Sequence, residues 1–240
     1  MATSGTTSFT VTRDDIIGAA LRVCHVYGPA DAIPSADITY CAQALNIMVK
    51  NWASKGMMIW CVPPDISLPT VAGVSTYQIG PTATGSGALV TDRPMRIIQA
   101  YIRDQNGNDT TLYKEARYDY NILGNKSSAG VPNQFYYDPL LGNGTITLYN
   151  VPQDNLSTIY LTIQRQVQDF NLSTDNPDFT QEWYHSLKWG LAAEIAPEYE
   201  VPLQKIQYLE NKAKASFDDV LNWSQEDAAI TFSPDNRWRG

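Results

Sequence analysis

FTQEWYHSLKWGLAAEIAPEY, residues 179–199, contains the clearest helical pattern of the chain. Its large apolar residues recur at every fourth position, which places them along one face of an α-helix: Trp183, Leu187, Leu191 and Ile195. Thr180 is a suitable N-cap, and Phe179 and Tyr184 flank it at the positions of a hydrophobic staple. Pro197 lacks a backbone donor and ends the helix. The stretch therefore predicts a helix that buries one face in a core.

Glu182 and His185 give the same stretch a second interpretation, as half of a metal site. A Glu and a His three residues apart lie on one helix face, and di-iron and di-manganese bundles hold their metals with two such pairs. The chain has 2 His, and the residue three positions before the other one, His25, is Arg22. The second pair is missing, so we interpret His185 as the polar edge of a packing helix and expect no metal.

Two further helices are predicted near the N-terminus by the same apolar period. The first begins at the N-cap Thr12, with Asp15 close to a capping-box position, and it stops at Gly28. The second runs from near Ser35 to Gly56. Because the connection between them is short, we expect a helical hairpin.

A last helix is predicted after Pro202. Its apolar stripe consists of Leu203, Ile206, Leu209, Ala213, Phe217, Val220 and Leu221. The remaining positions alternate between bases and acids, which is typical of a solvated face; the bases are Lys205, Lys212 and Lys214.

Between the helical segments the period changes to that of strands. The runs VSTYQI, MRIIQAYIRD, GTITLYNV and TIYLTIQRQV alternate in part, and MMIWCV is a short apolar run rich in strand formers. Asn106-Gly107 and residues 142–144 are turn signals. Residues 80–94 and 126–132 are small and polar, and we expect exposed loops there.

The order of these segments predicts an α+β fold. We expect a helical bundle made from the N- and C-terminal helix pairs, with an inserted mainly-β lobe and an extended C-terminal arm. The expected parts are a helical hairpin at 1–56, the β lobe with long loops at 57–178, the second helix pair at 179–226 and the arm at 227–240.

The charge of the chain excludes some partners. Its formal net charge of −8 argues against a protein that grips nucleic acid by neutralising phosphates. The first residues show no signal-peptide pattern, and no run of apolar residues is long enough for a membrane span. Cys24, Cys41 and Cys61 are odd in number and lie in apolar stretches, which indicates buried free thiols and assembly in a reducing cytoplasm.

Catalytic motifs are missing from the sequence. There is no phosphate-binding Gly-Lys-Ser/Thr loop, no dinucleotide fingerprint, no Gly-x-Ser-x-Gly elbow and no zinc-type Cys or His spacing. We therefore expect neither an enzyme nor a cofactor. A pair of carboxylates for glycoside hydrolysis is not visible in a sequence, so an enzyme that cleaves peptidoglycan stays as an alternative, beside an unrelated helical binding module.

The C-terminal segment has no helical period and ends in Arg237-Trp238-Arg239. Trp and Arg are common interface anchors, and this tail has no core of its own to join. Binding to a partner is one interpretation, and a frayed end is the other.

Taken together, these segments resemble the head-to-tail adaptors of short-tailed phages, the family of tail tubular protein A and packaged-DNA stabilisation protein. The first half shares a capped helix and a long helix that ends in Leu45-Asn46-Ile47-Met48, Trp52 and Gly56. The second half shares VPNQFYYDP, GTITLYNVP and the segment 178–202. Residues 81–92 depart from the family, and their role is open.

The resemblance implies a structural virion protein that assembles in the host cytoplasm. Such adaptors form a ring, twelve-fold in this family, between the portal protein and the tail nozzle protein. Double-stranded DNA would pass through the ring without specific binding, and the ring would help to retain packaged DNA. The C-terminal arm would contact the portal through Phe232, Arg237, Trp238 and Arg239.

Overall fold

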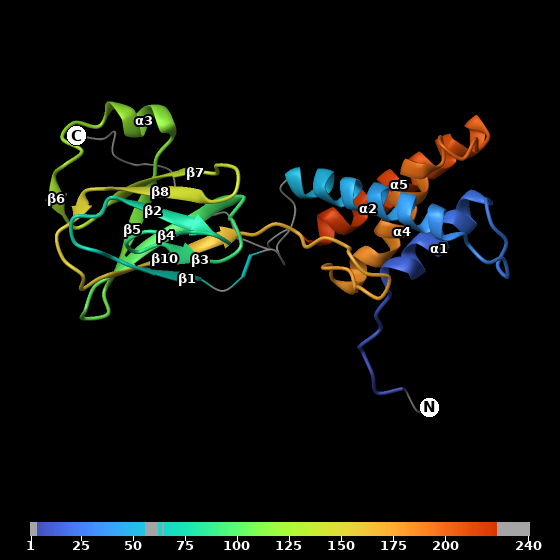
Figure 1. Ribbon diagram of the computed structural model, residues 1–240, viewed down its shortest axis with the longest axis horizontal. Helices are drawn as coiled ribbons and strands as arrows, with labels where there is room; N and C mark the ends of the chain where they lie inside the picture. The colour runs from blue at the N-terminus through green and yellow to red at the C-terminus, as the bar shows by residue number, and fades with distance from the viewer. Residues whose placement is uncertain (1–3, 56–61, 64, 225–240) are drawn as a thin grey trace, which may run out of the picture. The chain divides into compact units, whose positions relative to one another are not determined.

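The computed structural model describes residues 4–55, 62–63 and 65–224 (Figure 1). The chain divides into two compact units. Met1–Ile59 and Phe170–Gly240 form the helical unit, and Trp60–Asp169 form the β unit. The expected arm at 227–240 lies outside the described residues.

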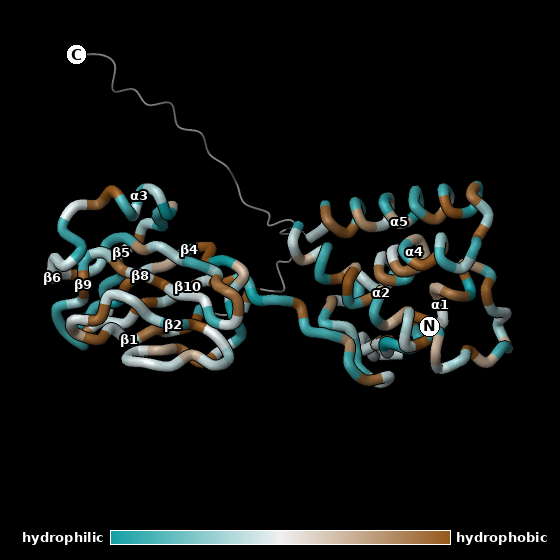
Figure 2. Tube along the Cα trace, turned by 45° about the horizontal axis from the view of Figure 1, so that its top comes forward, coloured by the Kyte–Doolittle hydropathy of each residue, from teal (hydrophilic) through white to brown (hydrophobic). Residues whose placement is uncertain are grey.

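The helical unit is built from both ends of the chain. Its elements are α1 (Arg13–Cys24), α2 (Ser35–Ser54), the short 3₁₀ helix η2 (Gln181–Trp183), α4 (Tyr184–Ile195) and α5 (Leu203–Trp223). The four α-helices predicted from the sequence are thus confirmed in this part of the chain. Helix α4 packs against α1, α2 and α5, and α5 alternates hydrophobic and hydrophilic residues along its length (Figure 2).

The β unit contains one large mixed sheet with strand order β1-β10-β4-β5-β7-β8-β2-β3 among the described residues. The pairs β2–β3 and β5–β7 are parallel, whereas the other neighbours are antiparallel. A second, two-stranded sheet pairs β6 with β9. The bounds are β1 (Ile66–Pro69), β2 (Thr76–Gly80), β3 (Leu89–Val90), β4 (Arg96–Arg103), β5 (Asp109–Lys114), α3 (Arg117–Ile122), β6 (Ala129–Gly130), β7 (Gln134–Asp138), β8 (Gly144–Tyr149), β9 (Val151–Pro152) and β10 (Thr158–Gln164).

The expected fold class, a helical bundle with an inserted mainly-β lobe, is wrong. The described residues form an α+β protein dominated by a nearly closed sheet of eight strands, and they contain five α-helices. The error has a physical cause: many neighbouring strands of this sheet are far apart in sequence. Strand β10 lies between β1 and β4, and local periodicity carries no information about such pairing.

Short strands were also missed. Residues 80–94, which we expected to form a loop, contain β3, and 126–132 contain β6. Strand β5 buries only Leu112 of its six residues, so it shows no alternation that the sequence pattern could reveal.

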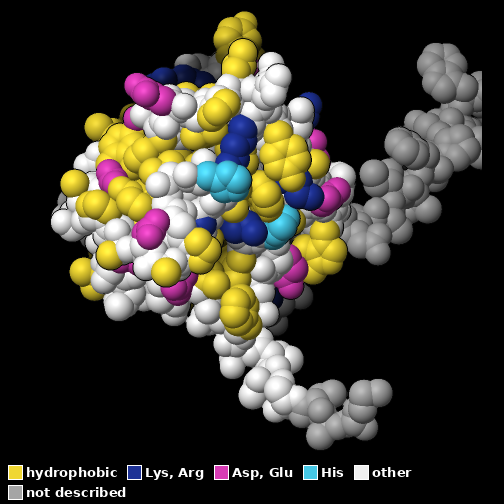
Figure 3. Space-filling model, turned by 90° about the vertical axis from the view of Figure 1, so that its right-hand side faces the viewer, with side chains coloured by type: hydrophobic (Ala, Val, Ile, Leu, Met, Phe, Trp, Pro, Cys, Tyr) yellow, Lys and Arg dark blue, Asp and Glu magenta, His cyan; other side chains and the backbone are white. Residues whose placement is uncertain are grey.

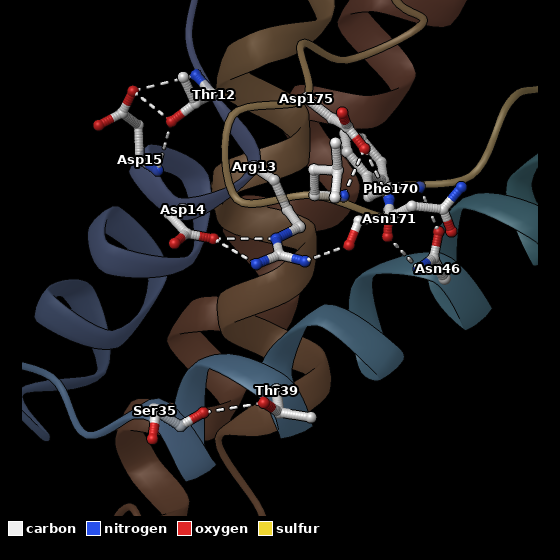
Figure 4. A network of polar contacts seen from close by, with 11 residues as sticks. Thr12, Arg13, Asp14, Asp15, Ser35, Thr39, Asn46, Phe170, Asn171 and Asp175 are labelled. Atoms are coloured by element: carbon white, nitrogen blue, oxygen red, sulfur yellow. Dashed lines mark hydrogen bonds and ion pairs between the residues drawn. The ribbon is translucent and has the colours of Figure 1, made fainter.

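The predicted cap of α1 is confirmed (Figure 4). The backbone N–H of Asp15 donates to Thr12 Oγ1 at 3.2 Å, and the backbone N–H of Thr12 donates to Asp15 Oδ2 at 3.0 Å. These bonds satisfy two donors at the helix start. The bond from the Thr12 N–H, together with a bond from the Thr12 hydroxyl to Asp15 Oδ2 at 2.7 Å, holds the pKa of Asp15 below its usual range. The helix ends earlier than expected, since His25 adopts a left-handed conformation with φ 63° directly after Cys24.

The core of the helical unit forms around the stripe that the sequence predicted on α4. Its four members, Trp183, Leu187, Leu191 and Ile195, each have 0% of their surface exposed. Trp52 of α2 lies 6.0 Å from Trp183 and 4.9 Å from Phe217 of α5, measured between ring centroids. Aromatic rings from three separate segments therefore join α2, α4 and α5 in one cluster.

The core of the β unit is formed by alternating residues of its long strands. Strands β8 and β10 bury every second side chain, among them Ile146, Leu148, Ile159 and Leu161. Tyr137 of β7 is buried among them and its hydroxyl donates to the carbonyl oxygen of Pro94 at 2.6 Å. Desolvation raises the pKa of Tyr137 to about 12, and the nearby Arg93 lowers it only in part.

Candidate functional site

Basic side chains gather on one face of the helical unit (Figure 3). Helix α4 contributes three residues to this face, spaced i, i+3 and i+4 from His185. Helix α5 contributes three more, spaced i, i+3 and i+7 from Lys205, so each set lies on one side of its helix. We call this surface the basic face, and it consists of His185, Lys188, Trp189, Lys205, Tyr208 and Lys212.

Aromatic contacts hold the basic face together across the two helices. The rings of His185 and Trp189 lie 6.0 Å apart, and those of Trp189 and Tyr208 lie 6.2 Å apart, both edge to face. Lys188 Nζ lies 5.0 Å from the centroid of the Trp189 ring, which is a cation–π geometry. Trp189 is therefore the centre of the face.

Two donors in the basic face lack an acceptor. Lys205 Nζ and Trp189 Nε1 are both buried, and neither has a hydrogen-bond partner among the described residues. An ammonium and an indole N–H can only donate. A buried donor without a partner costs stability, so this face is suited to a group that accepts hydrogen bonds.

The positive charge of the face is also unneutralised within the described part of the chain. Lys188, Lys205 and Lys212 form no ion pair there. Partial burial lowers the pKa of His185, and the ammonium groups of Lys188 and Lys212 lower it further. The face thus disfavours an additional cation and favours an anion.

The structure corrects one expectation from the sequence. Lys205, Lys212 and Lys214 were expected to share a solvated face, and Lys212 and Lys214 are indeed exposed. The ammonium of Lys205 is instead buried, close enough to the Cys24 thiol for its charge to oppose the rise in the pKa of that thiol. The sequence did contain a signal for this difference. Lys205, Tyr208 and Lys212 are spaced so that they lie on one side of the helix, and Lys214 lies outside that spacing.

The residues of the rejected metal interpretation lie at the start of α4. Glu182 belongs to η2, where its own backbone N–H lowers the pKa of its carboxyl group. His185 contacts Trp189. Within the described ranges, no group of three or more His, Cys, Asp or Glu side chains is placed to share a metal ion.

The proposed portal-binding residues Phe232, Arg237, Trp238 and Arg239 lie outside the described residues.

Two of the three cysteines are buried free thiols, as predicted, and Cys61 lies outside the described residues. Cys24 Sγ donates to the carbonyl oxygen of Ala192 at 3.3 Å, which ties α1 to α4. Cys41 Sγ lies 3.7 Å from the hydroxyl of Tyr199. Burial raises the pKa of Cys24 to about 11, so this thiol is a poor nucleophile at neutral pH.

The β unit offers a shallow hollow of about 480 Å³. Small and polar residues line it, together with Lys126, whose ammonium donates to the carbonyl oxygen of Asn121 at 2.8 Å. Elsewhere on this unit, Leu141 at the turn between β7 and β8 is 100% exposed.

Comparison with known proteins adds no relative: no family model matches the chain, and no curated protein matches it. Among the residues that the structure describes, none of the helices combines the length and hydropathy needed to cross a bilayer.

Proposed function

We propose that this chain is a structural virion protein, a head-to-tail adaptor that forms a ring between the portal protein and the tail nozzle of a short-tailed phage. The ring would line the DNA exit channel and help to retain packaged DNA. The proposal starts from the sequence resemblance, which spans nearly the whole chain.

The observation that carries the proposal is that the two halves of the resemblance meet in space. Asn46, from the motif at the end of α2, binds both backbone groups of Phe170, with Asn46 Nδ2 donating to the carbonyl at 3.1 Å and the Phe170 N–H donating to Oδ1 at 2.9 Å (Figure 4). Trp52, from the same motif, packs on Trp183 in the returning segment. These residues hold the helical unit together, so the motif at the end of α2 and the returning segment belong to one folded unit.

Exposed apolar residues on both units support an assembly. Ile47 of α2 is 66% exposed, and Leu203 and Trp223 of α5 are also exposed. On the β unit, Tyr118 and Ile122 of α3 are exposed, as is Leu141. A ring needs two different contact surfaces on each subunit, and exposed aromatic and aliphatic side chains commonly form them.

The charge of the chain suits a DNA channel. Twelve copies at −8 each give 12 × −8 = −96. An acidic assembly repels the phosphates of duplex DNA, so the duplex slides through it rather than binding to its wall.

The proposal is tested by measuring the mass of the purified chain alone and after mixing with the portal protein of the same phage. We expect a ring-sized complex in the presence of portal. A chain that stays monomeric and does not bind the portal contradicts the proposal. Hydrolysis of purified peptidoglycan by the chain would instead favour the cell-wall-cleaving alternative.

A further inference from the structure

Helix α5 carries two lysines of the basic face in its first half and two carboxylates near its C-terminal end, with Glu210 and Lys214 nearer its middle. Lys205 and Lys212 of the basic face lie in its first half, whereas Asp218 and Asp219 are exposed near its C-terminal end. Trp223, one turn beyond them, is 64% exposed. Neither carboxylate forms an ion pair within the described part of the chain. We call Asp218, Asp219 and Trp223 the acidic end.

The basic face and the acidic end are complementary. The basic face carries unneutralised ammonium groups, whereas its two donors without acceptors, Lys205 Nζ and Trp189 Nε1, are buried. A carboxylate of a partner can accept hydrogen bonds from the ammonium groups that reach the surface. The ammonium groups of Lys188 and Lys212 can contact a carboxylate directly. The buried ammonium of Lys205 attracts the same carboxylate over a longer distance, through surroundings of low dielectric constant. Tyr208, which is 57% exposed, offers an aromatic surface to Trp223.

The two surfaces do not meet within one molecule. They lie on the same continuous helix, which rises about 1.5 Å per residue, so Asp219 lies about 21 Å from Lys205 and about 10 Å from Lys212 along its axis. No ion pair joins Asp219 to either lysine within the described residues. The carboxylates that reach the basic face must therefore come from elsewhere. Duplex DNA is disfavoured, because a chain with a net charge of −8 repels it.

We propose that the basic face binds the acidic end of α5 in a second copy of this chain. The contact joins two different surfaces, so every dimer still has one free basic face and one free acidic end. Further copies can bind to these surfaces until the rotation between subunits closes a ring. The inference rests on the proposed function and names the interface between neighbouring subunits.

Charge-reversal variants of the full-length chain test the contact. Lys212→Glu changes the basic face, and Lys214→Glu, two residues further on α5 and also exposed, is its control. Asp219→Lys changes the acidic end, and the exposed Glu210→Lys is its control. Self-association is measured by sedimentation and mass photometry, and folding by circular dichroism. If Lys212→Glu does not fold, Lys212→Gln removes the charge without reversing it.

We expect Lys212→Glu and Asp219→Lys each to weaken self-association by about tenfold or more, because each places like charges opposite one another in the contact, while both controls assemble as the wild type does. A chain that carries both reversals should regain assembly, because the charges of the two surfaces are exchanged. The inference is overturned if the double variant fails to recover or if Lys212→Glu behaves like Lys214→Glu. It is also overturned if Lys212→Glu assembles normally but binds duplex DNA less tightly than its control.

Failure of this inference is distinguishable from failure of the proposed function. A ring that forms with the portal and is unaffected by Lys212→Glu or Asp219→Lys leaves the adaptor function standing and places the interface elsewhere. A wild-type chain that stays monomeric, both alone and with portal, contradicts the two together.

Discussion

Gly190 of α4 lies directly against Trp52 of α2: a Cβ atom at position 190 would come within 2.6 Å of Cζ2 of the indole and 2.9 Å of Met48 Sδ. The absence of a side chain at Gly190 is what lets the two helices approach. This contact joins the motif at the end of α2 to the segment 179–199, the two parts of the sequence that most strongly suggested the fold.

Gly190→Ala should therefore destabilise the helical unit. Overpacking a close contact costs about 1–3 kcal/mol, and the better helix propensity of Ala offsets about 1 kcal/mol of it. Urea unfolding followed by tryptophan fluorescence measures the change, since Trp52 and Trp183 lie at the contact. Gly124→Ala is the control, because a Cβ there meets nothing within 4 Å. Equal stability of the two variants would contradict the packing.

Asn46→Ala should loosen the attachment of residue 170 to α2. The change leaves the N–H and the carbonyl of Phe170 without the partners they have in the wild type, at a cost of about 1–3 kcal/mol. We expect faster hydrogen exchange at the Phe170 amide and a lower free energy of unfolding of the helical unit. Gln43→Ala, at an exposed position of the same helix, should change neither. An unchanged exchange rate in Asn46→Ala would show that the two bonds are dispensable.

The sequence predicts the helical unit better than the β unit, and the reason is the range of the interactions. The cap at Thr12 and the stripe on α4 depend on residues within a few turns, and both are confirmed. The fold class was wrong because the large sheet depends on contacts such as the one between β1 and β10, which join strands far apart in sequence.

The basic face was missed for the same reason. His185 and Lys212 belong to different helices, and only the packing of α4 on α5 brings their charges together. On the sequence alone, His185 is an isolated residue and Lys212 is one base in a mixed helix. The metal interpretation of Glu182 and His185 depended only on residue spacing within one helix. The side chains that surround His185 come from two helices, α4 and α5, and spacing within one helix does not reveal them.

Tyr137→Phe should change how the stability of the β unit depends on pH. The pKa of Tyr137 is raised to about 12 in the folded chain from an ordinary value of 10.0, so its contribution to stability is complete below pH 10 and is lost as the pH rises toward 12. The wild type should lose stability more steeply than Tyr137→Phe over that interval. At neutral pH the variant should be less stable by about 1 kcal/mol, because the bond to Pro94 is lost.

Urea unfolding followed by circular dichroism at pH 8, 10 and 11.5 measures this difference. Tyr113→Phe, at an exposed position of β5, is the control and should follow the wild type. If the curves of wild type and Tyr137→Phe were parallel above pH 10, the buried hydroxyl would not be the group that titrates.

Deleting residues 228–240 should weaken portal binding without unfolding the chain. The proposed anchors Phe232, Arg237, Trp238 and Arg239 all lie in this segment, and Trp and Arg carry much of the binding energy in protein interfaces. Replacing Arg237, Trp238 and Arg239 with Ala should reproduce the loss, whereas Ala at Ser233, Asp235 and Asn236 should leave binding near that of the full-length chain. Binding to portal rings is measured by co-sedimentation, and the melting temperature reports the fold. Full binding by the deletion variant would mean that the adaptor meets its portal through other residues.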